Sequence, residues 1–154
     1  MSIDTSGKWW RGTAFPDISE YLQALKPGGY DVTLVLEARC TCGSTSFHLR
    51  LDRDEELGQT ECATCSLRTF VADSEALWSE ARPKVLRCIC KHNVFRVGLG
   101  LSIRDGEWVL WGSLGTLCSK CHVLASPLDW KSDLDLSDPE AYRVASGTIL
   151  TGAA

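Results

Sequence analysis

No apolar run in this chain of 154 residues approaches the roughly 20 residues that a helix needs to cross a bilayer. The first residues, Met1-Ser2-Ile3-Asp4, lack the basic region and apolar core of a secretory signal. We therefore expect a cytoplasmic protein without membrane partners, in a compartment that keeps thiols reduced. The composition, 44% hydrophobic and 23% charged, is that of a globular chain and not of a disordered one.

Sequence signatures of catalysis are also missing. The chain contains no P-loop, nucleophile elbow, H-E-x-x-H or Gly-rich dinucleotide turn. It has C-x-x-C pairs, but not the H-x-E element that accompanies such a pair in zinc deaminases. We therefore predict that the protein is not an enzyme.

Basic charge is scarce, and the chain has no Lys/Arg run. The net charge is −4, although residues 84–126 carry 6 basic and 2 acidic side chains, a local excess of +4. An acidic protein lacks the long-range attraction to phosphate on which nucleic-acid binding depends. The charge therefore disfavours a nucleic-acid partner.

Cysteine, by contrast, is plentiful and ordered. The eight cysteines form four close pairs in the order C-x-C, C-x-x-C, C-x-C, C-x-x-C. A shift of 48 residues maps Cys40 onto Cys88 and Phe47 onto Phe95, and it also matches alternate apolar positions behind them. This pattern predicts a repeated supersecondary unit.

Two close cysteine pairs on separate turns can supply the four soft ligands of a tetrahedral structural zinc site. We predict two Zn²⁺ ions, each bound within one repeat; an arrangement with ligands shared between repeats remains open. Disulfides, a redox-active C-x-x-C, and iron in place of zinc are the alternatives. The histidines His48, His92 and His122 are not needed as ligands. The predicted ligands are Cys40, Cys42, Cys62, Cys65, Cys88, Cys90, Cys118 and Cys121.

Two cysteine pairs around a β-hairpin resemble the zinc-ribbon family, with rubredoxin-like zinc knuckles, over residues 39–72 and 87–125. The C-x-C pairs depart from the two-residue spacing of most ribbons. Each ribbon alone has a small core, so we expect the metal to be part of what holds the fold together.

The remaining segments add helices to this β framework. Asp17 and Glu20 predict the start of an amphipathic helix that Pro27-Gly28-Gly29 ends, and residues 30–38 alternate as a strand. A linking helix is expected over 73–81, with Leu77 and Trp78 facing inward. A second hairpin turns at 105–106, and its returning strand, 107–114, is apolar on both faces.

We therefore predict an α+β, mostly β protein with two tandem zinc-ribbon units, an N-terminal helix and a linking helix. The expected parts are residues 1–38, a helix and strand packed on the first ribbon; 39–83, the first ribbon with the linking helix; 84–130, the second ribbon; and 131–154, an acidic tail with a short helix near 137–140.

The expected function is that of a non-enzymatic structural-zinc module that binds an unidentified protein, as an adaptor, an inhibitor or an immunity-type protein. Six tryptophans are many for this length, and aromatic side chains are enriched where interfaces gain most of their energy. Nucleic-acid binding through a basic face of the second unit is the alternative, followed by an iron redox role. The candidate partner-binding residues are Trp9, Trp10, Arg96, Arg104 and Trp111.

Overall fold

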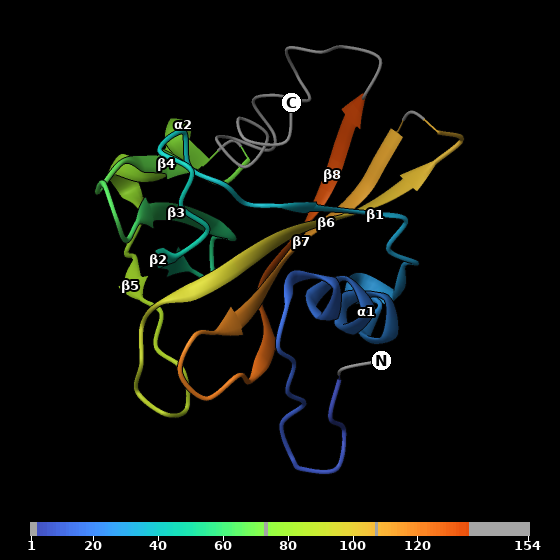
Figure 1. The fold of residues 1–154 in the computed structure, drawn as a ribbon. Helices are drawn as coiled ribbons and strands as arrows, with labels where there is room; N and C mark the ends of the chain where they lie inside the picture. Colours follow the sequence, from blue (N-terminus) through green and yellow to red (C-terminus); the bar gives the residue numbers. More distant parts are fainter. Residues whose placement is uncertain (1–2, 73, 107, 136–154) are drawn as a thin grey trace.

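The computed structural model describes residues 3–72, 74–106 and 108–135. Strands predominate over helices, which confirms the predicted α+β, mostly β class (Figure 1). None of the helices in these ranges is both long and apolar enough to cross a membrane. The elements in chain order are α1 (Phe15–Leu25), η1 (Pro27–Gly29), β1 (Leu34–Glu37), β2 (Phe47–Asp52), β3 (Leu57–Cys62), β4 (Arg68–Phe70), α2 (Ser74–Leu77), η2 (Trp78–Glu80), β5 (Lys84–Val85), β6 (Phe95–Arg104), β7 (Trp108–Cys118) and β8 (Leu124–Asp135).

The described strands form one sheet whose order is palindromic. It runs β4-β3-β2-β6-β7-β8, and β1 and β5 pair with β6 and β2 outside this path. Strands β1 to β4 belong to the first repeat and β5 to β8 to the second, so corresponding strands lie at equal distances from the centre. At the centre, Phe47 of β2 pairs with Phe95 of β6.

The strand that precedes each C-x-C turn pairs with the other repeat. Glu37 of β1 lies opposite Gly98 of β6, and Val85 of β5 lies opposite Arg50 of β2. A shift of 48 residues converts the first pair into the second. The two ribbon-like units are therefore interlocked by exchanged arms, and pairing crosses the expected boundary at 83/84.

A single apolar core serves both repeats. Leu49 of β2 and Leu99 of β6 are buried in it together with Leu114 of β7 and Leu128 of β8. A ribbon of some 40 residues can bury only a small core by itself, so sharing increases the apolar surface that each unit removes from water.

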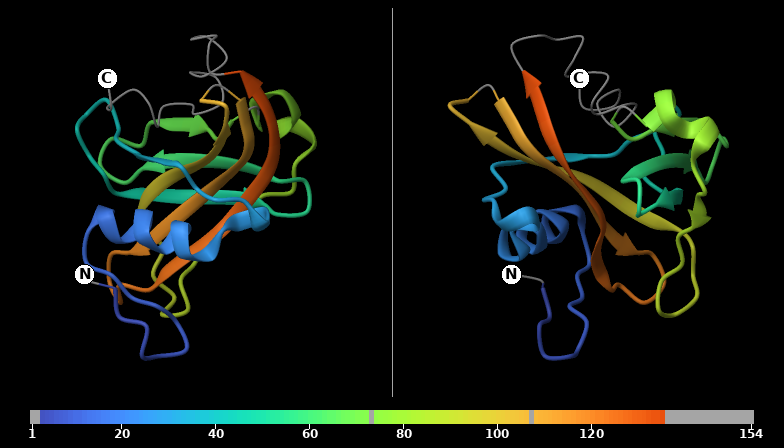
Figure 2. Two further views of the ribbon diagram at one scale, coloured as in Figure 1. Left: turned by 90° about the vertical axis from the view of Figure 1, so that its right-hand side faces the viewer. Right: turned by 180° about the vertical axis from the view of Figure 1, so that it is seen from behind.

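Helix α1 was expected to pack on the first ribbon, but it packs on the second unit. Because β1 pairs with β6, the chain ahead of β1 lies over β6, β7 and β8 (Figure 2). Glycines on this face of the sheet let the helix approach closely. A Cβ atom at Gly115 would lie 2.6 Å from Ile18 Cγ2, and one at Gly100 would lie 3.0 Å from Leu22 Cδ1. The glycines that alternate with apolar residues along β6 therefore face the helix.

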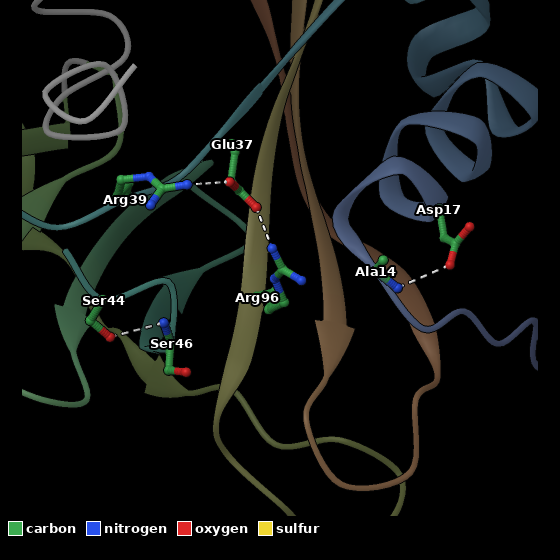
Figure 3. A network of polar contacts seen from close by, with 7 residues as sticks. All are labelled: Ala14, Asp17, Glu37, Arg39, Ser44, Ser46 and Arg96. Atoms are coloured by element: carbon green, nitrogen blue, oxygen red, sulfur yellow. Dashed lines mark hydrogen bonds and ion pairs between the residues drawn. The ribbon is translucent and has the colours of Figure 1, made fainter. Parts of the chain in front are cut away.

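The start of α1 is fixed by a buried carboxylate. Asp17 stands at the third position of the helix rather than at its cap, and its Oδ2 accepts the backbone N–H groups of Thr13, at 2.7 Å, and Ala14, at 3.0 Å (Figure 3). The bond from Ala14 satisfies one of the donors that a helix start leaves free, and the bond from Thr13 fixes the chain just ahead of the helix. The helix ends at Leu25 and is capped by Lys26, which adopts a left-handed conformation with φ of 52°.

The predicted linking helix is shorter than expected and divided. It consists of the four residues of α2 and the three of η2, while residue 73 lies outside the described ranges. Leu77, expected to face inward, is 51% exposed. Its neighbour Trp78 packs edge-on against Phe70 at 5.4 Å between ring centroids, and Ser74 accepts the Gly58 N–H at 2.9 Å.

Strand β8 was not foreseen, because its end was assigned to the acidic tail. It continues through Asp135 and pairs with β7, where Leu128 lies opposite Leu114. It completes the sheet beside β7. The apolar pattern of β7 requires both of its faces to be covered, and the shared core covers one face and α1 the other. Residues 136–154, including the short helix expected near 137–140, lie outside the described residues.

Candidate metal centres

The first four cysteines converge at one end of β2 and β3. Cys40 and Cys42 lie on the turn that leads into β2; Cys62 is the last residue of β3, and Cys65 lies on the turn that follows it. The Sγ atoms of Cys40 and Cys65 are 3.4 Å apart, those of Cys42 and Cys62 are 3.6 Å apart, and all four lie within 4.8 Å of one another.

The last four cysteines reproduce this arrangement. The Cys88 and Cys121 sulfurs are 3.3 Å apart, those of Cys90 and Cys118 are 3.6 Å apart, and the four again lie within 4.8 Å of one another. Each group consists of the four thiols of one repeat, as the spacing predicted.

Matching backbone bonds form the two sets of turns. Cys40 N–H donates to Ser44 O at 2.9 Å, and Cys88 N–H donates to His92 O at 2.8 Å. The turns after β3 and β7 both pass through a residue with φ of 67°, which is Ser66 in one and His122 in the other. The same local conformation thus presents the sulfurs in each repeat, although the intervening hairpins differ in length.

The sulfur separations suit a metal ion better than a disulfide. A disulfide requires about 2.05 Å between sulfurs. Four thiolates placed tetrahedrally at about 2.3 Å from a zinc ion would be separated by about 3.8 Å. The separations of 3.3 to 3.6 Å across the paired thiols lie close to that tetrahedron, so each group can hold a metal ion.

Backbone N–H groups prepare one thiol of each group for ionisation. Burial alone would raise the pKa of Cys62, but the N–H groups of Cys65 and Thr64 point at its sulfur and lower the pKa to about 6. The backbone at His92 lowers the pKa of Cys90 to about 7. Burial raises the pKa of Cys88 to about 12, so a full set of thiolates requires a cation among them.

The two centres differ in exposure. Cys42 and Cys65 of the first group are exposed, whereas Cys88, Cys90 and Cys121 of the second are half-buried. The second centre is also covered by the N-terminal loop, in which Gly12 N–H donates to His122 O at 2.9 Å. We therefore expect chelators to reach the first centre sooner.

The histidines do not belong to either metal-binding group found among the described residues. A ring nitrogen of His92, Nε2, lies 3.0 Å from Ser119 Oγ, and Nδ1 of His48 lies 3.0 Å from Asn93 O. His122 is exposed on its turn. Each group thus consists of four thiols, which fill a tetrahedral site.

The candidate partner-binding residues are not brought together. Trp9 is 46% exposed and has Lys8 Nζ at 5.2 Å from its ring, whereas Trp10 packs edge-on against Tyr21 in the cluster around α1. Trp111 is half-buried against Tyr30, with 5.7 Å between ring centroids.

The basic face expected on the second unit is interrupted along β6. A carboxylate that the sequence analysis overlooked, Glu37 of β1, forms an ion pair with Arg96 and also binds Arg39 (Figure 3). Arg104 is exposed at the far end of the strand, and α1 covers the glycines between them. Only the exchange of β1 places Glu37 beside Arg96, and no local sequence signal indicates that contact.

No protein-family model, curated protein or solved structure matches the chain. What can be said of its function therefore comes from its own residues.

Proposed function

We propose that each group of four cysteines holds a structural Zn²⁺ ion and that the protein is a non-enzymatic module that binds another protein. The closure of both thiol quartets carries this proposal, since all four sulfurs of each lie within 4.8 Å of one another. Four thiolates leave no coordination position for water or substrate, so the metal would stabilise the fold rather than catalyse a reaction. The same four thiolates can also bind iron, and elemental analysis distinguishes the two metals.

The second centre supports the surface we assign to the partner. The turn between Cys118 and Leu124 holds the N-terminal loop through backbone bonds, among them Leu124 N–H to Trp10 O at 2.8 Å. Trp10 anchors this loop inward, while Trp9 remains 46% exposed beside Lys8. An exposed indole on a supported loop is typical of residues that dominate the energy of protein interfaces.

Elemental analysis of freshly purified protein tests the metal. We expect two zinc ions per chain and colourless protein; a coloured protein containing iron, or a protein without transition metal, would contradict the assignment.

Affinity capture from native lysate, followed by mass spectrometry, tests the partner. We expect the wild-type chain to recover a protein in stoichiometric amount and Trp9→Ala to lose it. Trp108→Ala is the matched control, because Trp108 is also 46% exposed but lies at the opposite end of β7 from the second centre. Equal loss with both variants, or no stoichiometric partner at all, would count against this surface.

A further inference from the structure

A cleft unconnected with the thiols lies between the β2–β3 turn and the segment around β5. Its volume is about 440 Å³, within the range of small-ligand sites. Arg53 contributes one wall, and Arg82, Lys84 and Arg87 contribute the other. Four cationic side chains therefore surround one small volume in a chain whose net charge is −4.

Positive charge exceeds negative charge in the lining of this cleft. Among residues 3–72, 74–106 and 108–135, the ion pairs involve Lys26, Arg39, Arg68 and Arg96, and none of the four cleft cations. Two carboxylates, Asp52 and Asp54, also line the cleft. Both oxygens of Asp52 accept backbone N–H groups, and its charge also interacts with that of Arg82. Four cations therefore face two carboxylates, and the excess positive charge is open to a ligand.

Asp52 also gives the cleft its shape. Its Oδ1 accepts the N–H of Glu55 at 3.2 Å, and its Oδ2 accepts the N–H of Arg82 at 3.0 Å. One buried carboxylate therefore joins the β2–β3 turn to the start of the β5 segment, 30 residues later in the chain. Asp52 is a positioning residue, because it holds the two cationic walls at a fixed separation.

The equivalent place between β1 and β6 shows that the fold does not require three of these four charges. The 48-residue shift relates Arg53 to Leu101, Arg82 to Leu34 and Lys84 to Leu36. Leu34 of β1 lies opposite Leu101 of β6, and both belong to the shared core or pack against it. Apolar residues thus occupy three of the four equivalent places, while Arg87 corresponds to Arg39. Arg53, Arg82 and Lys84 are therefore specific to this cleft.

We propose that this cleft binds a compact phosphate-bearing anion of low molecular weight. Guanidinium and ammonium groups on two opposing walls suit the several oxygens and the double charge of a phosphoryl group better than a single carboxylate. The neighbouring depression shares Asp52, Asp54, Arg82 and Lys84 with the cleft and adds Glu55 and Glu80, whose charges repel a longer polyanion extending that way. The cleft lining contains no aromatic ring on which a nucleobase could stack.

Calorimetric titration of the metal-loaded full chain tests this site, with inorganic phosphate and pyrophosphate as probes and citrate as the carboxylate comparison. We expect one saturable site with a Kd on the order of 0.1–1 mM for a phosphate probe, and weaker binding of citrate. Amide NMR shifts should concentrate in residues 51–55 and 82–87. Tighter binding of citrate, or shifts that increase linearly without saturation, would overturn the proposal.

Matched substitutions separate the cleft from general charge. Lys84→Gln should weaken binding of the phosphate probe about fivefold to tenfold. Lys131→Gln removes the same charge from another exposed strand lysine and should leave the affinity unchanged. Asp52→Asn should also weaken binding, although it removes a negative charge, because the two walls would no longer be joined. Equal weakening by the two lysine substitutions, or tighter binding by Asp52→Asn, would overturn the site.

Discussion

Phe47 and Phe95 lie opposite each other at the junction of β2 and β6. On its other side Phe47 pairs with Cys62, and Phe95 pairs with Cys118. A single row of backbone pairs therefore runs from one candidate metal ligand to the other across four strands. All four residues are buried, so the two centres are joined through the interior of the sheet.

This row predicts that the two metal centres stabilise each other. Replacing Cys118 with Ser should remove the metal from both centres, because unfolding of β7 would also release the arm β1 and the shared core. Structural zinc contributes about 10–16 kcal/mol in small zinc modules, which is comparable with the whole stability of a domain. We expect elemental analysis to find neither metal in the variant and circular dichroism to show loss of the sheet.

Lys120→Gln, an exposed position between the ligands Cys118 and Cys121, is the control and should keep both metals. Retention of one metal and of an ordered first unit by Cys118→Ser would show that the centres are independent.

Gly115→Ala should destabilise the protein by about 1–3 kcal/mol, because the added methyl group would lie 2.6 Å from Ile18 Cγ2. Ile18→Leu removes that branch at nearly constant volume, so the double variant should recover part of the loss. Gly7→Ala, whose new methyl group would lie 3.6 Å from its nearest neighbour, should have little effect. Urea unfolding of the four variants measures these differences. Additive losses in the double variant would argue against contact between helix and sheet at this position.

Glu37→Gln should reduce stability by about 1 kcal/mol at low salt, because it leaves the half-buried Arg96 without its ionic partner. Added salt should narrow the difference from wild type. Asp31→Asn breaks the exposed pair with Lys26 and should cause no measurable change. Unfolding midpoints at two salt concentrations test this comparison. An equal effect of the two substitutions would show that exchange of β1 adds nothing through Arg96.

Asp52→Asn should make the stability of the protein depend less strongly on pH in the acidic range. The backbone N–H of Arg82 lowers the pKa of the Asp52 carboxyl below its usual value. A lowered pKa means that this carboxylate stabilises the folded state above the unfolded pKa of about 3.9. That contribution is lost as pH falls through the folded pKa. Urea midpoints between pH 6 and pH 3 should therefore fall more steeply for wild type than for Asp52→Asn. Asp54→Asn, in the same turn, should retain the wild-type slope.

Local spacing was enough to predict the cysteine quartets and the β6–β7 hairpin. Each depends on residues close in sequence, such as the turn at Asp105-Gly106 and the alternation from Phe95 to Ile103. The C-x-C and C-x-x-C turns are likewise built by backbone bonds across a few residues. Elements of this kind carry their own conformational signal.

The pairing of strands from different repeats could not be predicted from the sequence. β1 and β5 have four and two residues, too few to specify by pattern whether they pair within their own repeat or with the other. The position of α1 follows from that choice, and so does the contact between Glu37 and Arg96. β8 was not foreseen, and its end was assigned to the tail because Lys131 and the aspartates after it are typical of a solvated segment, although only one side of an edge strand needs apolar residues.

The exchanged arms have a consequence for any chain cut to a single repeat. Such a fragment would keep its arm strand without a pairing partner, and its sheet would lack the arm strand of the other repeat. The unpaired arm and the unpaired sheet edge are complementary. A second copy of the fragment would fill both, so the covalent link between repeats makes intramolecular what would otherwise depend on concentration. The link also allows the two repeats to differ in sequence. Here one repeat has glycines beneath a helix, while the equivalent place beside the other has charged residues around a cleft.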